Sequence, residues 1–229
     1  MNATARRVNA LARQLHCRRY LEIGVLHGTT FRDVEIPERT AVDPGFGFDT
    51  SELANERTRF FKQTSDAFFV NEPMSPQYDL VLIDGMHTFE QVVRDLSNVL
   101  LRTHQRSVII LDDTVPDDVY SAVKDGAASY EYRKLDTAPA RGWQGDVYKT
   151  LFYIHDYIPN LEYRTIMGAG NPQTLVWRST GIARTPVFDD LERISRLSYF
   201  EFQSHLKVLQ PASEDEAIAL CIAGVQAIA

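Results

Sequence analysis

The sequence predicts a doubly wound α/β fold: a mostly parallel sheet with helices on both faces, an antiparallel strand at its edge and a helical C-terminal extension. Three observations predict it. Short apolar runs alternate with segments of helical spacing over the first half of the chain, which is the pattern of βαβ units. The runs over 80–83 and 108–111 are continuous, as in strands buried on both faces. Two β-rich runs then flank a glycine–proline turn, and residues 186–229 carry no strand pattern.

The first half of the chain supplies most of the expected elements. Strands are predicted over 19–25, 39–44, 59–65, 78–84 and 107–113. Helices are predicted over 2–16, 29–35 and 66–71, and another begins at Thr88. Thr88 and Gln91 fit a T-x-x-Q capping box at the start of that helix.

The second half is less regular. Residues 114–146 are polar and rich in turn residues, and a helix over 146–158 would have Asp146 as its cap. The runs LEYRTIM and QTLVWRS flank GAGNP, which predicts an antiparallel hairpin. Two helices are expected after residue 186, the second opened by a capping box of Ser213 and Glu216.

Composition narrows the classes of function. The chain has 229 residues and a net charge of −7, which argues against nucleic acid as the main partner. Its two cysteines form no CxxC pattern, so we expect neither a structural disulfide nor a zinc site, and a reducing cytoplasm fits. No run approaches the roughly eighteen apolar residues of a membrane span, and we expect no membrane partner.

Acidic residues stand at the ends of the predicted strands. They are Glu22, Asp43, Asp66, Asp84, Asp112 and Asp113. Ligands of open α/β sheets bind beyond the carboxyl ends of the strands, where clustered carboxylates repel one another. No lysine or arginine lies beside these ends in the sequence, so a divalent cation with oxygen ligands would compensate them. The alternative is that these acids are helix caps or turn residues, and it applies above all to Asp43.

A glycine turn follows the first strand. The run EIGVLHG places Gly24 and Gly28 as G-x-x-x-G, whereas the dinucleotide fingerprint requires G-x-G-x-x-G, so hydride chemistry with a nicotinamide cofactor is disfavoured. Asp43 lies nineteen residues after Gly24, a spacing that suits an acid accepting both hydroxyls of a ribose. A nucleotide-like ligand is therefore expected.

These motifs resemble the class I S-adenosylmethionine-dependent methyltransferases over roughly residues 15–180. The resemblance implies a cofactor-binding methyltransferase domain over 1–180, with 114–150 as a substrate lid and 181–229 as a helical extension. It implies that the turn holds the methionine part of the cofactor and the acid after strand two its ribose. The implied cofactor residues are Glu22, Gly24, Gly28, Asp43, Ser65, Asp66 and Asp84.

A narrower resemblance is to catechol O-methyltransferase and to the sugar O-methyltransferases of antibiotic biosynthesis. It implies that Asp84, Asp112 and Asp113 bind magnesium or another divalent cation. His87 stands where the catechol enzymes have a lysine base. An imidazole with a pKa near 6.5 can act as a base at neutral pH. The alternatives are that His87 contacts the cofactor or substrate, or packs at the start of its helix.

Two further features bear on substrate and assembly. Trp143, Asp146 and Lys149 fall in the implied lid and are substrate candidates, since an aromatic residue beside a glycine hinge suits a lid that excludes water. Plain packing of Trp143 against the sheet is the alternative. The last helix is apolar around much of its circumference, which favours a homodimer or packing on its own domain.

We therefore expect a cytoplasmic O-methyltransferase that depends on S-adenosylmethionine and a divalent cation and acts on a small hydroxylated molecule, such as a sugar diol or a catechol. One alternative is a metal-independent methyltransferase acting on nitrogen, carbon or a carboxylate. Another is a non-catalytic partner protein that binds the cofactor without transferring its methyl group.

Overall fold

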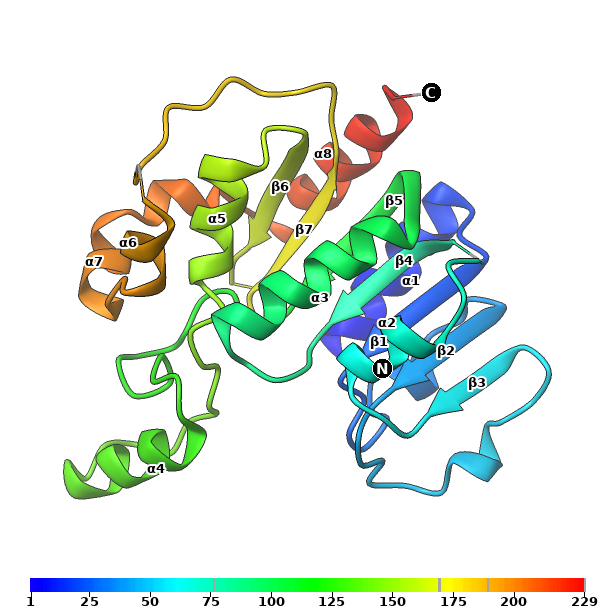
Figure 1. Ribbon diagram of the computed structural model, residues 1–229, viewed down its shortest axis with the longest axis horizontal. Coiled ribbons are helices and arrows are strands. Elements are labelled where there is room, and N and C mark those ends of the chain that lie inside the picture. The colour runs from blue at the N-terminus through cyan, green and yellow to red at the C-terminus, as the bar shows by residue number, and fades with distance from the viewer. Residues whose placement is uncertain (76, 169, 189, 229) are drawn as a thin grey trace.

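The computed structural model describes residues 1–75, 77–168, 170–188 and 190–228. Eight strands of the described residues form one sheet in the order β3-β2-β1-β4-β5-β7-β6-β8 (Figure 1). They are β1 (Arg19–Ile23), β2 (Glu38–Val42), β3 (Thr58–Phe61), β4 (Tyr78–Ile83), β5 (Thr103–Leu111), β6 (Leu161–Ile166), β7 (Gln173–Arg178) and β8 (Pro211–Ala212). Strands β1 to β5 are parallel and β7 is antiparallel to both its neighbours. This confirms the predicted mostly parallel sheet and its antiparallel hairpin, although position 169 of the GAGNP turn lies outside the described residues.

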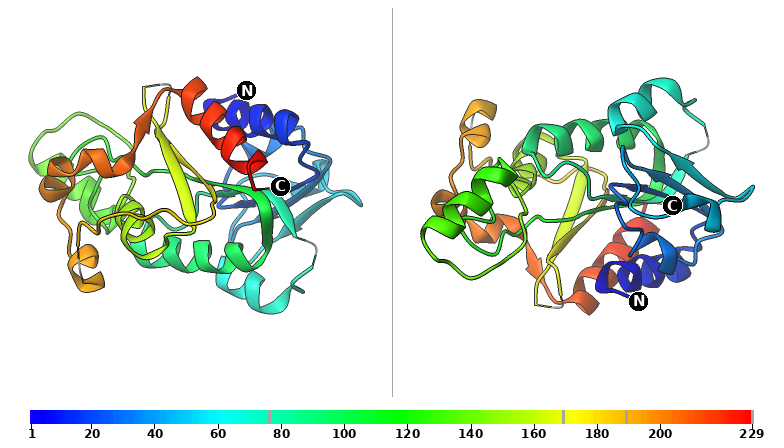
Figure 2. Two further views of the ribbon diagram at one scale, coloured as in Figure 1. Left: turned by 90° about the horizontal axis from the view of Figure 1, so that it is seen from above. Right: turned by 90° about the horizontal axis from the view of Figure 1, so that it is seen from below.

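Helices cover both faces of the sheet (Figure 2). The α-helices are α1 (Ala3–Leu15), α2 (Ser65–Asn71), α3 (Phe89–Leu101), α4 (Gly126–Leu135), α5 (Lys149–Tyr157), α6 (Leu191–Ser195), α7 (Tyr199–Ser204) and α8 (Glu214–Gln226). Short 3₁₀ turns are η1 (Phe31–Asp33), η2 (Thr50–Glu52) and η3 (Leu206–Leu209). Helices α2, α3 and α5 pack on one face and α1 and α8 on the other, so each face has its own apolar cluster. Strands with apolar side chains on both sides are buried by this arrangement.

The last helix packs against its own chain. Ser213 caps α8 by accepting a hydrogen bond from the amide of Glu216, as predicted. The buried face of α8 consists of Ala217, Cys221 and Val225. This face packs against α1 and against strands β5, β6 and β7, within the apolar cluster on that side of the sheet. The expected homodimer stays a prediction, which sedimentation equilibrium can test.

Some predicted elements are wrong in detail. The sequence does not predict α4, because it has no long apolar stripe there. This helix projects from the body of the protein (Figure 1) and has few buried residues, so it needs no such stripe. The helix expected over 29–35 is the single 3₁₀ turn η1. The region after residue 186 contains the short strand β8 and three α-helices in place of two.

Two predicted helix caps are also wrong. The side chain of Thr88 makes no capping hydrogen bond to α3, and the Gln91 side chain is bonded to α2 instead. Helix α5 begins at Lys149, and its N-cap Tyr148 has no side-chain bond. Asp146 instead accepts a hydrogen bond from the amide of Phe89 at 2.7 Å and so caps α3 from a distant part of the chain.

Within the described ranges, no helix combines the length and the apolar character that a bilayer span requires.

Candidate active site

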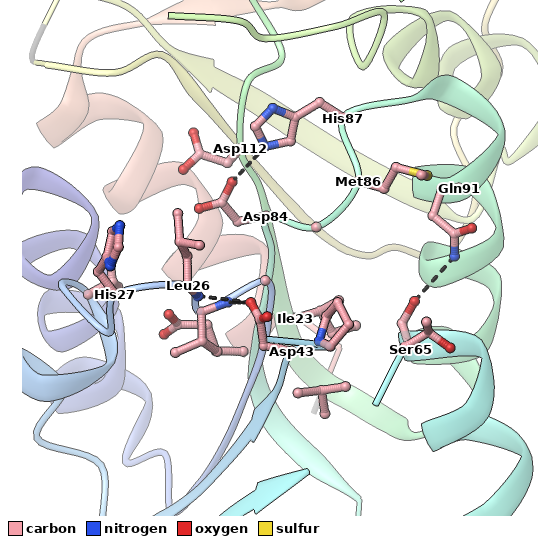
Figure 3. A pocket seen from close by; sticks show the side chains of 18 of the residues that line it. Ile23, Leu26, His27, Asp43, Ser65, Asp84, Met86, His87, Gln91 and Asp112 are labelled. Atoms are coloured by element: carbon pink, nitrogen blue, oxygen red, sulfur yellow. Dashed lines mark hydrogen bonds and ion pairs between the residues drawn. The ribbon is translucent and has the colours of Figure 1, made fainter. Parts of the chain in front are cut away.

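A cavity of about 750 Å³ opens at the carboxyl ends of β1, β2 and β4 (Figure 3). The predicted site residues that line it are Glu22, Gly24, Asp43, Ser65, Asp66, Asp84, His87 and Asp112. Parallel strands bring their ends to one edge, which is why residues far apart in the sequence meet here. The volume falls within the range of about 300–1,000 Å³ that small-molecule sites occupy.

The glycine turn after β1 lies directly against the end of β4. Gly24 has φ +83°, and a β-carbon there would lie 1.8 Å from the carbonyl oxygen of Asp84. Gly28 has φ +71°, and a β-carbon there would lie 2.7 Å from the ring of Phe48. Side chains at these two positions would separate the turn from its supports, so both glycines are required by the close approach and the backbone conformation.

Asp43 holds the glycine turn in place. Its Oδ2 accepts hydrogen bonds from the amides of Val25 and Leu26, both at 2.8 Å, and its Oδ1 accepts one from the amide of Gly45 at 2.7 Å. A carboxylate offers about four acceptor positions. Three are in use, which leaves room for one ligand hydroxyl rather than the two expected of a bidentate ribose contact.

Glu22 is a buried acid at the back of the cavity. It is 2% exposed, and the hydroxyl of Tyr20 donates to its Oε2 at 2.7 Å. Burial raises the pKa of Glu22 to about 8, and the charges of Asp84 and Asp112 add to this effect. The carboxyl is therefore protonated at neutral pH in the protein alone, and a cationic ligand would favour its ionisation.

Ser65 and Asp66 stand at the start of α2, on the β3 side of the cavity. The Gln91 side chain of α3 donates to Ser65 Oγ and to Asp66 Oδ1, both at 3.2 Å. Arg94 pairs with Asp66 Oδ2 at 2.7 Å. These contacts join α2 to α3 and fix the polar end of the cavity.

Asp84, His87 and Asp113 form a compact group at the ends of β4 and β5, which we call the acidic cluster. His87 Nε2 lies 3.3 Å from Asp84 Oδ1 and 3.1 Å from Asp113 Oδ2. One ligand atom from each residue lies within 4.8 Å of the others. Asp113 has φ +57°, a conformation that aspartate tolerates better than most residues.

Burial and neighbouring charges shift the pKa values of the three residues in the acidic cluster. Burial raises the pKa of Asp84, and it raises that of Asp113 to about 6. Burial alone would lower the pKa of His87, but its hydrogen bond to Asp84 and the charges of Asp113 and Asp84 outweigh this and raise it to about 9. In the protein alone, a protonated His87 therefore compensates the carboxylates.

Asp112 is held differently from its neighbour. Gln173 Nε2 donates to its Oδ2 at 2.8 Å, and its Oδ1 accepts from the Asn171 amide group and from the amide of Asp113. Asp112 therefore lines the cavity but is braced by amides, and the structure brings His87 rather than Asp112 into the cluster with Asp84 and Asp113. Asn171 and Gln173 were missed in the sequence, where the signal was their place at the beginning of an antiparallel strand.

The acidic cluster fits a divalent cation by its donor chemistry. It offers carboxylate oxygens that accept hard cations such as Mg²⁺, and an imidazole nitrogen that suits transition metals as well. Burial raises the pKa values of Asp84, Asp112 and Asp113, and the charge of Asp84 adds to this at the other two, so a bound cation would stabilise the ionised carboxylates.

The three substrate candidates lie outside the cavity wall. Trp143, Asp146 and Lys149 are not among its lining residues in the described part of the chain. Asp146 is 2% exposed and Lys149 8% exposed, and they pair with each other at 2.9 Å. All three lie around the loop that carries His87 rather than facing a bound ligand.

Comparisons with known proteins agree with this geometry. Residues 21–114 match the family described as "Methyltransferase domain". The fold is similar to the O-methyltransferase TomG from Streptomyces achromogenes, solved with S-adenosylmethionine (15% identity, 78% of this chain and 81% of that chain, TM-score 0.55). It is also similar to an O-methyltransferase from Bacillus cereus (15% identity, 78% and 82% covered, TM-score 0.52) and to PaMTH1 from Podospora anserina (13% identity, 78% and 80% covered, TM-score 0.53). No curated protein matches the sequence. The chain therefore resembles a methyltransferase domain over residues 21–114, and its fold is that of these solved structures.

Proposed function

We propose that the protein transfers the methyl group of S-adenosylmethionine to a hydroxyl group of a small molecule, with a divalent cation at the acidic cluster. One observation carries the proposal: His87 Nε2 lies between Asp84 Oδ1 and Asp113 Oδ2 at the rim of a cavity large enough for a cofactor. The solved O-methyltransferases with a similar fold support transfer to oxygen.

The cofactor would occupy the cavity between the glycine turn and α2. Gly24 lets the turn approach the end of β4, and the free acceptor position of Asp43 suits a ribose hydroxyl. Ser65 and Asp66 lie where the adenine would end. Glu22 would face the positively charged methionine part and ionise when the cofactor binds.

The acceptor would bind beside the acidic cluster, under the lid of residues 114–150. Asp84 and Asp113 would hold the cation, with Asp112 braced beside them. Such a cation lowers the pKa of an acceptor hydroxyl and orients it. Two oxygens on adjacent carbons, as in a sugar diol or a catechol, would suit this arrangement best.

In the transfer step the neutral form of His87 would act as the base. A cation held by Asp84 and Asp113 would compensate these carboxylates in place of the imidazolium and so lower the pKa of His87 from about 9 in the protein alone. The Nε2 of His87 takes the hydroxyl proton while the oxygen attacks the methyl carbon, so the new O–C bond forms as the S–C bond breaks. The electron pair of the broken bond stays on sulfur, which becomes a neutral thioether. Asp84 and Asp113 stabilise the imidazolium that results, and in-line positioning supplies much of the rate.

The test uses the purified protein with S-adenosylmethionine and a panel of catechols and sugar diols, before and after EDTA. We expect methyl transfer to stop with EDTA and to return with Mg²⁺ or Mn²⁺. Transfer that survives EDTA would support the metal-independent alternative. Binding of S-adenosylhomocysteine without any transfer would support the non-catalytic partner protein.

The chain supplies a matched control for His87. At the opposite edge of the sheet from the cavity, Asp79 of β4 pairs with His104 of β5 at 2.7 Å, so the same two residue types form an ion pair there. His87→Gln should reduce transfer by about a hundredfold, the usual scale of a lost general base, whereas His104→Gln should leave it unchanged. Equal rates in the two variants would refute the role of His87.

A further inference from the structure

Residues 143–146 form hydrogen bonds with the loop that carries His87, and we call these four residues the clamp. The carbonyl oxygen of Trp143 lies 3.2 Å from His87 Nδ1. The amide of Asp146 donates to the carbonyl of His87 at 3.3 Å. Asp146 Oδ1 accepts a hydrogen bond from the amide of Phe89 at 2.7 Å. The clamp thus contacts the ring of His87, its backbone and the first residue of α3.

The clamp is itself held rigidly. Gly145 has φ +65°, and a β-carbon there would lie 1.7 Å from the carbonyl oxygen of His87, so the backbones meet as closely as a glycine permits. Asp146 Oδ2 accepts from Lys149 Nζ at 2.9 Å, and Lys149 also donates to the carbonyl of Ser195. The indole of Trp143 donates to the carbonyl of Val123 at 2.7 Å.

The contact with Trp143 places a proton on Nδ1 of His87 and fixes the direction of Nε2. A carbonyl oxygen can only accept, so Nδ1 must be the donor. With Nδ1 held by Trp143, Nε2 faces the carboxylate oxygens Asp84 Oδ1 and Asp113 Oδ2. The hydrogen bond of one imidazole nitrogen orients the other in this way at metal sites.

We propose that the clamp is a positioning device that holds the Nδ1–H of His87 on the carbonyl of Trp143 and so directs Nε2 at the acidic cluster, and that Asp146 is its positioning residue. Asp146 acts from outside the cavity through Phe89 and the backbone of His87. The consequence for catalysis rests on the proposed function, whereas the effect on the ring of His87 does not.

The test observes the ring directly by NMR at neutral pH of protein labelled with ¹⁵N-histidine, with the signals of His87 assigned by their loss in His87→Gln. We expect the Nδ1–H proton of the original protein to exchange slowly with water, because the carbonyl of Trp143 holds it. In Asp146→Ala the His87 spectrum should change, because this proton exchanges about tenfold faster or more. Asp146→Asn, which keeps an oxygen for Phe89, should restore slow exchange.

Asp156 provides the matched control on the same stretch of chain. Its side chain is fully buried, it lies on α5, and it accepts hydrogen bonds from the amides of Val187 and Phe188, both at 2.9 Å. Asp156→Ala should lower the melting temperature without changing the His87 spectrum. An unchanged His87 spectrum in folded Asp146→Ala, or the same change in Asp156→Ala, would overturn the proposal.

A second variant covers the case in which Asp146→Ala does not fold. Asp146→Glu keeps the charge opposite Lys149 but moves both oxygens by one methylene, so the bond to Phe89 is displaced. The Nδ1–H proton of His87 should exchange faster in this variant also, and an unchanged rate refutes the clamp.

Two further measurements separate this proposal from the proposed function. Affinity for S-adenosylhomocysteine should stay within about twofold, because Asp146 does not line the cavity. With an identified acceptor, kcat of Asp146→Ala should fall about tenfold or more while KM for the cofactor is kept. If the exchange of the Nδ1–H proton changes but the original protein methylates no hydroxylated compound, the clamp stands and the proposed function fails.

Discussion

Replacing Glu22 by glutamine should stabilise the protein at neutral pH, and the gain should grow as the pH rises. Glu22 is 2% exposed, and burial raises its pKa to about 8. Glutamine keeps an oxygen that can accept the hydrogen bond from Tyr20, but it never carries a charge. The variant therefore removes the cost of ionising this position and little else.

The sign and size follow from linkage. The carboxyl titrates near 4.5 when the chain is unfolded and near 8 when it is folded. Between these values the folded protein keeps a proton that the unfolded chain loses, so the free energy of unfolding falls as the pH rises, by about 1.4 kcal/mol per pH unit. Over the whole interval from pH 4.5 to about 8, the free energy of unfolding falls by about 5 kcal/mol. Below the lower value both states are protonated and the contribution disappears.

Urea unfolding of both proteins without cofactor, at several pH values from about 4 to 9, measures this difference. The curves should meet at the acid end and separate steadily up to about pH 8. Glu38→Gln is the control, because Glu38 lies at the opposite end of the neighbouring strand β2 and pairs with Arg19 at the surface. Parallel curves for the original protein and Glu22→Gln would refute the assignment of a raised pKa to Glu22.

Three other predictions concern the cofactor turn, the buried ion pair and the acidic cluster. Gly24→Ala forces a β-carbon against Asp84, so calorimetry should detect no binding of S-adenosylhomocysteine; binding at the original affinity would contradict the turn geometry. Arg7 is fully buried and pairs with Glu214, so Arg7→Met should lower the free energy of unfolding by about 3 kcal/mol, and a loss below about 1 kcal/mol in urea would count against it. Mn²⁺ binding followed by EPR should weaken about tenfold or more in Asp84→Asn but not in Asp79→Asn; equal weakening in both would place the cation elsewhere.

The sheet could be predicted because its sequence signal is local. Strands β4 and β5 each contain a continuous apolar run that stops at an acid, as in VLID, where β4 ends at Ile83 before Asp84. The sequence does not predict α4, because most of its residues are exposed and its polar sequence carries no apolar stripe that faces a core. The role of Asp146 was mistaken because an acid before a helix normally caps that helix, whereas here it caps α3 across 57 residues of sequence.

The residues that line the cavity could be predicted from the sequence, but the contacts of the acidic residues beside it could be predicted only in part. Glu22, Asp43 and Asp84 meet because parallel strands end at a common edge. The brace on Asp112 could not be inferred, because Gln173 reaches it from the beginning of β7, a strand that runs in the opposite direction. Pairing across 61 residues depends on the order of strands in the sheet, which the sequence does not state.

Residues 114–146 have a structural property that bears on how such proteins diversify. The segment begins directly after Asp113 and ends at the clamp, so both of its ends are fixed beside His87. Between these anchors it is braced internally, with Arg133 bonded to Asp118 at 2.7 and 2.8 Å. We infer that the segment is an exchangeable module. Under the proposed function, a change in its length or side chains would change the choice of acceptor, while the two anchors keep the acidic cluster and the cavity where they are.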